Sequence, residues 1–285
     1  MAADNKNKTI LITGCSSGIG LCVAQGLQTR GYRVIATARK DADVAMLKQL
    51  GLESLQLDVA DEVSIDQAMQ TILSMTDGKL YALFNNGAYG QTGAVEDIPT
   101  DVLREQFNTN VFGWHALTRR VIPIMRQQGC GRIIQNSSVL GFIALPFRGP
   151  YNASKFALEG LSDTLRLELA GSGIFVSLIE PGPIRSRFRE NALQAFEKNI
   201  DAKNSVHSKK YQSMIERLKK EGDAMPFTLP PEAVLKRVIH ALESTSPQPR
   251  YYVTFPTYLF GTLKRLLPHR WLDSVLLRIS SGGKR

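Results

Sequence analysis

A tyrosine and a lysine four residues apart, in the stretch YNASK, are the residue types of this chain best suited to proton transfer. Residues at this spacing are neighbours on one face of a helix, so Tyr151 and Lys155 would lie side by side. The pKa of an ordinary tyrosine is about 10, which makes it a poor base at neutral pH. An ammonium about 4 Å away, at an effective dielectric of about 20, would lower that pKa to about 7. The pair therefore predicts a general acid/base.

Two further polar residues are candidates for the same site. Ser138 follows the apolar segment GRIIQN, 13 residues before Tyr151. Ligands of open α/β sheets bind at the carboxyl ends of strands, so Ser138 either contacts a ligand or is a turn residue or helix cap. Asn110 lies inside the apolar segment FNTNVFGWHAL, where it is either catalytic or a buried, hydrogen-bonded polar group.

The segment TGCSSGIG joins a strand-like stretch to a helix-like one. Gly14, Gly18 and Gly20 would let the backbone turn tightly and approach a ligand, while the helix N-terminus offers free N–H groups to a pyrophosphate. Glycines also form ordinary turns. Their position directly after a first strand favours a dinucleotide site.

The second strand-like stretch ends in TARK, which bears on the choice of cofactor. In dinucleotide folds an acid at this strand end holds the ribose of NAD, and an arginine accommodates the additional phosphate of NADP. Here Arg39 is present and the first acid is Asp41. Ser16 and Ser17 would add hydroxyl donors to the same phosphate. The segment indicates NADP(H), unless Arg39 is simply a surface residue.

The elements that would position these residues alternate between strands and helices, which predicts parallel strands with helical crossovers. The strands read as apolar on both faces, as a sheet covered on both sides requires. Strands are expected over residues 9–14, 32–38, 54–59, 80–84, 131–138, 174–182 and 250–255, and helices over 19–31, 61–75, 101–127, 151–169 and 230–244. The fold class is therefore α/β, a doubly wound parallel sheet in a single domain, 1–285, with its core over about 9–255.

The alternation stops after Pro183. Residues 185–230 are polar, basic and helix-like, and we expect them to cover the substrate site. Residues 257–280 form a tail of dense apolar residues that Pro268 should split into two helices. This tail either packs near the substrate entrance or lies in a membrane interface, with its basic residues meeting anionic lipid.

Composition limits the remaining classes of function. The net charge is +9, and the whole basic excess lies after residue 184, where no nucleic-acid-binding motif appears. Nucleic acid is therefore not an expected partner. The three cysteines and four histidines show no metal-binding spacing, so no metal is expected, and unpaired cysteines suit the cytoplasm. The polar start MAADNKNKTI does not read as a signal peptide, and no apolar run reaches the ~18 residues that span a bilayer.

Together these residues closely resemble the short-chain dehydrogenase/reductase family, over about residues 9–255. The segment TGCSSGIG matches the family's TGxxxGxG loop, and LDV supplies Asp58 at its adenine contact. The segment PGPIRS matches its PGxIxT segment beside the nicotinamide, with Ser186 in place of threonine. The family's catalytic tetrad falls, in order and spacing, on Asn110, Ser138, Tyr151 and Lys155.

The resemblance implies a Rossmann-type sheet and a role for each member of the tetrad. Tyr151 would exchange a proton with the substrate oxygen, and Ser138 would hydrogen-bond that oxygen. Lys155 would bind the nicotinamide ribose and lower the pKa of Tyr151, and Asn110 would hold a water that passes protons to Lys155. The implied NADP(H) contacts are Gly14, Ser16, Ser17, Gly18, Ile19, Gly20, Arg39, Asp58, Val59, Asn86, Gly87, Ala88, Tyr151, Lys155, Pro181, Gly182, Ile184 and Ser186.

One segment departs from the family pattern. Small residues follow the strand-like run ALFNN, which leaves room for the cofactor. The family usually has Asn-Asn-Ala-Gly there, whereas this chain has Gly87-Ala88 in reversed order. Because Ala88 lacks the freedom of glycine to take positive φ, the exchange bears on the local backbone path.

The expected function is an NADP(H)-dependent oxidoreductase that interconverts a carbonyl and an alcohol. Leu140, Phe142, Leu145 and Phe147 would form an apolar pocket wall and favour a lipophilic substrate, as in the family's carbonyl, aldehyde, hydroxysteroid and retinol enzymes. The alternatives are an NAD-dependent dehydrogenase working oxidatively and a non-catalytic protein that senses NADP(H). The family implies a homo-oligomer, a dimer or tetramer.

Overall fold

The computed structural model describes residues 5, 7–220, 222 and 226–280. The two ends of the predicted 1–285 domain, and residues 221 and 223–225 of the predicted substrate lid, lie outside the described residues.

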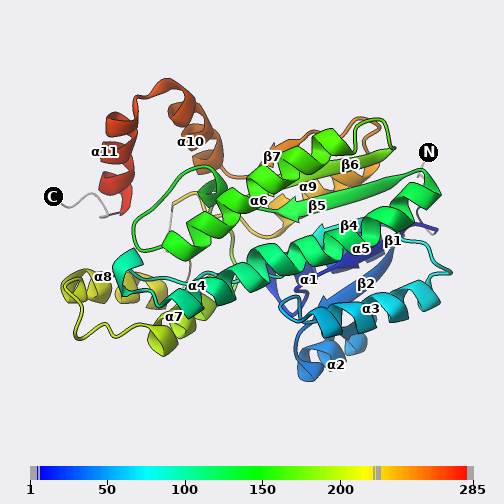
Figure 1. The fold of residues 1–285 in the computed structure, drawn as a ribbon, viewed down its shortest axis with the longest axis horizontal. Coiled ribbons are helices and arrows are strands. Elements are labelled where there is room, and N and C mark those ends of the chain that lie inside the picture. Colours follow the sequence, from blue (N-terminus) through cyan, green and yellow to red (C-terminus); the bar gives the residue numbers. More distant parts are fainter. Residues whose placement is uncertain (1–4, 6, 221, 223–225, 281–285) are drawn as a thin grey trace.

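The described strands form a single seven-stranded parallel sheet in the order β3-β2-β1-β4-β5-β6-β7 (Figure 1). Their order reverses between β1 and β4, so the predicted doubly wound sheet is confirmed. The strands are β1 Thr9–Ile12, β2 Arg33–Ala38, β3 Glu53–Gln56, β4 Ala82–Asn85, β5 Gly131–Asn136, β6 Ile174–Glu180 and β7 Arg250–Tyr252.

Helices cover both faces of the sheet, and each face has its own apolar core. One core joins the strands to α1 (Gly18–Thr29), α2 (Asp41–Gln49) and α9 (Glu232–Glu243). The other joins them to α3 (Glu62–Met75), α5 (Gly113–Gln128) and α6 (Gly149–Glu168). These burials explain why most strands read as continuous apolar runs.

Two details of the fold differ from the sequence-based expectation. The edge strand β3 has the sequence ESLQ, and its end residues Glu53 and Gln56 are exposed, so the expectation of strands apolar on both faces is wrong there. Helix α2 was not expected. Only Val44 and Leu47 are buried in it, which leaves little helical periodicity to detect.

The carboxyl ends of the strands point toward a group of helices from the second half of the chain (Figure 1). These are α7 (Phe188–Asn199), α8 (Ser208–Lys219), α10 (Phe255–Leu266) and α11 (His269–Ser280). The break between α10 and α11 at Pro268 is as predicted. No helix in the described part of the chain is both long and apolar enough to cross a membrane.

Candidate active site

A cavity of about 1010 Å³ lies at the carboxyl ends of the strands and gathers most of the predicted site residues. Its walls include the glycine loop, Arg39, Asp58 and the Pro181–Ser186 segment. Two predicted residues do not line it. Gly20 packs instead against the loop backbone, and Asn110 lies behind the cavity wall.

Tyr151 lies in the first turn of α6, and its side chain is almost fully buried at the cavity wall. Burial raises the pKa of the Tyr151 phenol to about 12, while a hydrogen bond with Ser138 and the charge of Arg148 act in the opposite direction. Ser138 follows β5, and its hydroxyl also accepts from the backbone N–H of Leu140 at 3.1 Å. Both residues therefore lie at the wall of the same cavity.

The side chain of Lys155 is buried one turn further along α6. Its Nζ donates to the carbonyl of Asn136 at 2.6 Å and lies 4.3 Å from the ring centroid of Trp114. Burial lowers the pKa of Lys155 to about 7, and the charge of Glu159 opposes that shift. The Nζ is 5.7 Å from the Tyr151 ring centroid, and Arg148 is the cation that lowers the tyrosine pKa, which differs from the expectation.

Asn110 lies in a π-helical turn, η2 (Asn108–Phe112), between α4 (Thr100–Phe107) and α5. The predicted helix over 101–127 is therefore interrupted, and such turns are frequent at functional sites. The amide of Asn110 donates to the carbonyl of Tyr89 at 3.0 Å and to the hydroxyl of Ser154 at 3.1 Å. Its side chain thus ties the segment after β4 to α6.

The glycine loop has no room for side chains, because its backbone packs closely against itself and against the segment after β4. Gly14 and Gly18 have φ of +70° and +57°. A Cβ on Gly14 would lie 2.5 Å from the Cα of Gly87, and one on Gly20 would lie 2.2 Å from the carbonyl oxygen of Gly14. Ser17, the N-cap of α1, makes no side-chain capping bond. The free N–H groups of the helix and this hydroxyl suit an anionic ligand.

The reversed Gly87-Ala88 pair is explained by the same contact between loops. The N–H groups of Asn86 and Gly87 both donate to the Thr13 hydroxyl at 2.9 Å, and the Trp114 indole donates to the carbonyl of Gly87 at 2.8 Å. Neither Gly87 nor Ala88 has positive φ. The exchanged order therefore does not require a left-handed backbone at either position.

Two predicted contacts at the adenosine end line the cavity. Arg39 is exposed at the carboxyl end of β2, and Lys40 and Asp43 line the cavity beside it. One carboxylate oxygen of Asp58 accepts from the N–H of Ala60 at 2.9 Å, so it stabilises the turn that follows Asp58.

Several cavity residues were not found from the sequence. Phe188 packs edge-on against Tyr151 with ring centroids 5.1 Å apart, and Arg187 donates to the carbonyl of Ser16 at 3.3 Å. Arg148 and Arg217 also line the cavity. Their place follows from tertiary contacts, so no local pattern marks them.

The expected apolar wall is half correct. Leu140 and Leu145 line the cavity. Phe142 instead stacks on Tyr252 with centroids 5.6 Å apart, and Phe147 packs against Tyr211 at the same distance. The tail supplies the remaining apolar contacts: Phe260, Leu272 and Leu276 belong to the cluster that contains Tyr151.

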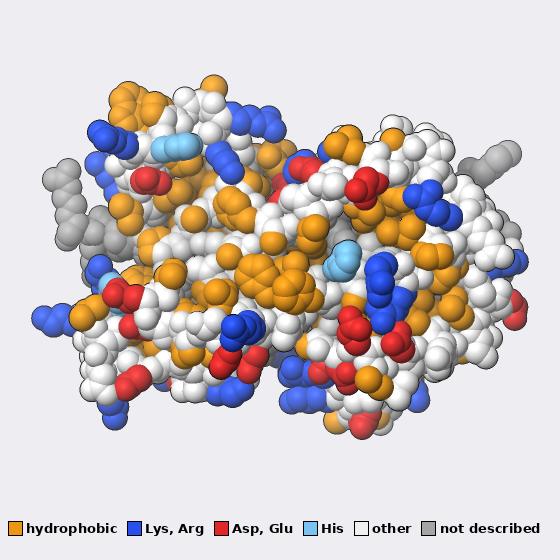
Figure 2. Space-filling model, in the orientation of Figure 1, with side chains coloured by type: hydrophobic (Ala, Val, Ile, Leu, Met, Phe, Trp, Pro, Cys, Tyr) orange, Lys and Arg blue, Asp and Glu red, His pale blue; other side chains and the backbone are white. Residues whose placement is uncertain are grey.

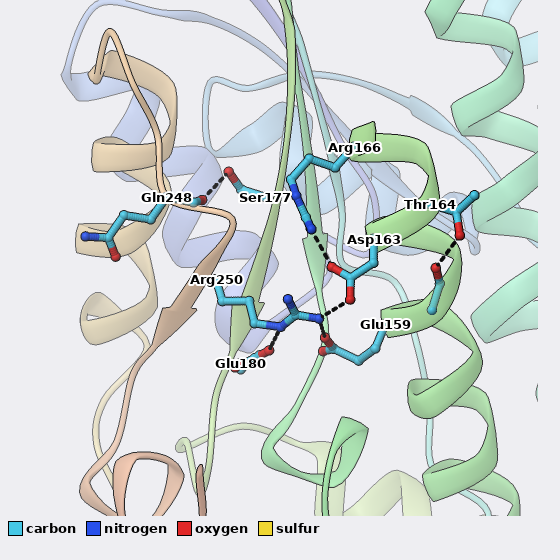
Figure 3. A network of polar contacts seen from close by, with 9 residues as sticks. Glu159, Asp163, Thr164, Arg166, Ser177, Glu180, Gln248 and Arg250 are labelled. Atoms are coloured by element: carbon cyan, nitrogen blue, oxygen red, sulfur yellow. Dashed lines mark hydrogen bonds and ion pairs between the residues drawn. The ribbon is translucent and has the colours of Figure 1, made fainter. Parts of the chain in front are cut away.

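A network of buried charges joins α6 to β6 and β7 (Figure 3). Arg250 lies 3.1 Å from carboxylate oxygens of Glu180 and Glu159 and 2.6 Å from one of Asp163. Burial and the charge of Glu159 raise the pKa of Glu180 well above that of an ordinary carboxyl. The network fixes the helix that carries Lys155 to the strand that leads into the Pro181 segment.

A doubly wound sheet with a glycine-lined cavity and a Tyr–Ser pair defines a nucleotide-binding oxidoreductase, and comparison with known proteins agrees. The family model for short chain dehydrogenase matches residues 8–196. The chain therefore belongs to the short-chain dehydrogenase family, whose members are oxidoreductases that bind NAD or NADP.

Relatives and solved structures extend the likeness over most of the chain. The uncharacterized oxidoreductase YbbO of Escherichia coli K12 is 44% identical over 269 residues, which cover 94% of each chain. The NADPH-dependent 3-dehydrocapnine reductase of Ornithobacterium rhinotracheale is 30% identical over 277 residues, covering 94% of this chain and 95% of that protein. A Burkholderia phymatum short chain dehydrogenase/reductase, solved with NAD, is 25% identical over 92% of this chain and 93% of its own, with a TM-score of 0.76.

Proposed function

We propose that this chain is an NADP(H)-dependent oxidoreductase that interconverts a lipophilic aldehyde or ketone and the corresponding alcohol. The observation that carries the proposal is that Tyr151 and Ser138 both line the cavity that the glycine loop also lines. NADP(H), when bound, supplies or accepts the hydride.

The residues of the site would transfer the proton, hydrogen-bond the substrate oxygen and hold the cofactor. In the reductive direction Tyr151 donates its phenolic proton to the carbonyl oxygen, and Ser138 hydrogen-bonds that oxygen. Because burial keeps the pKa of Tyr151 high, the phenol is protonated at neutral pH, which suits a proton donor. Lys155 and the backbone of the glycine loop would hold the cofactor, and Arg39 would bind the phosphate that distinguishes NADP from NAD.

An NAD-dependent enzyme working oxidatively is the second candidate, and one observation favours it. Asp43, in the first turn of α2, lines the cavity near Arg39 and would suit the free ribose hydroxyls of NAD. A protein that only senses NADP(H) would not need Tyr151 and Lys155 together.

We propose that the tail, residues 257–280, makes two kinds of contact, one with the rest of the protein and one with a membrane surface. Its inward residues close the apolar cluster around Tyr151. Leu266, Trp271 and Leu277 of the tail are more than half exposed. Figure 2 shows hydrophobic and basic side chains beside one another at the end of the molecule where Figure 1 places α10 and α11, which suits a peripheral contact with anionic lipid. We also propose that the protein is a homo-oligomer, since two apolar residues, Phe112 on η2 and Leu167 on α6, are exposed. We propose the cytoplasm as its compartment, which unpaired cysteines suit.

A screen of cofactor oxidation tests the proposal. The purified chain should oxidise NADPH in the presence of medium-chain aldehydes, ketones, quinones or steroids, with a higher kcat/KM for NADPH than for NADH. Alcohol oxidation with NAD and no carbonyl reduction would favour the second candidate. Tight NADPH binding without turnover on any carbonyl or alcohol would favour the sensor.

A further inference from the structure

Two arginines reach the cavity close to Tyr151 from segments far apart in the sequence. Arg148 is the N-cap of α6, and Arg217 lies in the last turn of α8. The charge of Arg217 lowers the pKa of Arg148, after the larger effect of burial, and the charge of Arg148 lowers the pKa of Tyr151. Arg148 is therefore within electrostatic range of both Arg217 and Tyr151.

Neither arginine forms an ion pair with a carboxylate in the part of the chain that the structure describes. Arg217 donates to the main-chain carbonyl of Ser280 at 3.2 Å. Burial lowers the pKa of both guanidinium groups, and among the described residues no carboxylate is a cause that raises either value. Arg250, by contrast, meets three carboxylates. Two neighbouring, partly buried cations repel each other and lack the compensation that such groups usually have.

The backbone holds Arg148 in place through an unfavourable conformation. Phe147, the preceding residue, has φ of +62°, a left-handed value that a bulky residue rarely adopts. Its carbonyl accepts from the N–H of Gly93 at 3.0 Å, and its ring packs against Tyr211 of α8. The same helix carries Arg217. The fold thus maintains a strained segment that brings the two arginines to one wall, as is common at ligand sites.

Four of the arginines that line the cavity form two pairs with different neighbours. Arg39, at the end of β2, and Arg187, bonded to Ser16, lie at the glycine loop, where cofactor phosphates would bind. Arg148 and Arg217 lie instead toward Phe147 and the end of α11. The same cavity is also lined by apolar residues, namely Leu140, Leu145, Phe188 and Ile279.

From this juxtaposition we propose that Arg148 and Arg217 bind an oxyanion of the substrate, so that the enzyme acts on apolar carbonyl compounds carrying a carboxylate or a similar group near the reacting carbon. A guanidinium matches the planar geometry of a carboxylate and is costly to leave unpaired when partly buried. The inference rests on the proposed function, since it specifies the substrate class of the same site.

A matched pair of substrates tests the proposal. The kcat/KM for 4-oxodecanoate and for its methyl ester is measured with NADPH for the wild type, Arg148→Gln, Arg217→Gln and the control Lys210→Gln, an exposed residue of α8. The wild type should prefer the acid. The ratio of acid to ester should fall about 10- to 100-fold in each arginine variant, the range expected for a charge-assisted hydrogen bond, and stay constant in the control. Using the ratio removes any effect of Arg148 on Tyr151 that both substrates share.

A second readout does not depend on turnover. Calorimetry in the presence of NADP⁺ should show decanoate binding to the wild type and weaker binding, by a similar factor, to Arg217→Gln. Decanoate binding that depends on Arg217 without reduction of either ketone would support the oxyanion site and count against the proposed reduction. Reduction of the ester with no preference for the acid, or equal ratios in wild type and both arginine variants, would overturn the oxyanion site and leave the reductase intact. Melting temperatures verify that each variant is folded.

Discussion

The cofactor side and the substrate side of the cavity are built in different ways. The cofactor side consists largely of backbone: two loops touch through Gly14 and Gly87, and Thr13 bonds the second loop. The substrate side consists of side chains from segments far apart in the sequence, such as Phe188 on α7 and Arg217 on α8. The first construction tolerates little change of residue, whereas the second permits new specificities on a constant frame.

Removing the Tyr151 hydroxyl should give the largest effect, because it lies where the two sides meet. Tyr151→Phe keeps the ring that packs against Phe188 but removes the proton donor. Turnover should fall about 10²–10⁴-fold while NADPH binding is kept. Stopped-flow turnover and fluorescence titration measure the two quantities. Tyr89→Phe, at another tyrosine of the cavity, is the control, and near-normal turnover of Tyr151→Phe would mean that the proton comes from elsewhere.

The charge network beneath α6 offers the next largest effect, this time on stability. Arg250→Met leaves the buried carboxyls of Glu159 and Glu180 without their partner, which should cost about 1–3 kcal/mol of unfolding free energy. Arg166→Met removes only the more exposed ion pair to Asp163 and should cost less than about 1 kcal/mol. Urea unfolding of both variants measures the difference. Equal stability of Arg250→Met and the wild type would contradict this account.

The pH dependence of that loss has a definite sign. A carboxyl whose pKa is raised in the folded state contributes stability at low pH and loses it as the pH rises through the folded value. Burial raises the pKa of Glu180, and Arg250 opposes this, so removing the arginine raises it further. Below about pH 9 the folded carboxyl is protonated in both proteins, so the deficit of Arg250→Met should stay nearly constant across neutral pH. It should grow as the pH rises above about 9, where Glu180 ionises beside Arg250 in the wild type, and a deficit that shrinks there would contradict the assignment.

The two sides also differ in how far the sequence predicts them. The strands and the glycine loop are readable because apolar runs, helix periodicity and glycines act locally. The π-turn at Asn110 has no local signal, since the sequence looks helical on both sides of it. Arg148 and Arg217 are brought to one cavity by tertiary packing, such as that of Phe147 on Tyr211 of α8. The effect of Lys155 on Tyr151 depends on burial and distance, neither of which the spacing alone provides.

The preference for NADPH over NADH tests whether a single side chain, that of Arg39, sets cofactor specificity. Arg39→Ala should weaken NADPH binding about 10- to 100-fold, because a charge-assisted hydrogen bond is lost, and should leave NADH nearly unchanged. Lys48→Ala, an exposed cation of α2 away from the cavity, is the control. Titration of NADPH and NADH against the wild type, Arg39→Ala and Lys48→Ala measures these affinities. Equal losses for NADPH and NADH would remove Arg39 from the phosphate site.

Substitution of exposed apolar residues of the tail tests whether the tail binds a membrane surface. Leu266→Ser with Trp271→Ser removes two exposed apolar side chains and leaves the inward Phe260 and Leu272 in place. Burying such side chains contributes about 1.5–3 kcal/mol each, so partition onto anionic liposomes should fall at least tenfold. Sedimentation at low and high salt measures it. A wild-type chain that stays in the supernatant at low salt would rule the membrane contact out.

A chain ending near Pro256 gives a complementary result. It lacks Phe260, Leu272 and Leu276, which pack in the cluster around Tyr151, so it should lose substrate affinity as well as liposome binding. Full retention of substrate affinity in the shortened chain would contradict a role of the tail at the substrate site.

The smallest expected effect concerns the reversed pair on the cofactor side. Gly87→Ala with Ala88→Gly restores the order usual in the family. Because neither residue has positive φ, the backbone accepts the exchange, but a Cβ at position 87 would lie 3.2 Å from the backbone nitrogen of Gly14. The glycine loop must then shift by a few tenths of an ångström, so we expect a few-fold change in NADPH affinity and an unaltered preference for NADPH over NADH. Gly14→Ala is the matched contrast, since its Cβ would meet Gly87 at 2.5 Å and its φ is +70°, and it should weaken NADPH binding more than the exchanged pair does. Loss of folding in the double variant would show that the contact between the two loops tolerates no side chain at position 87.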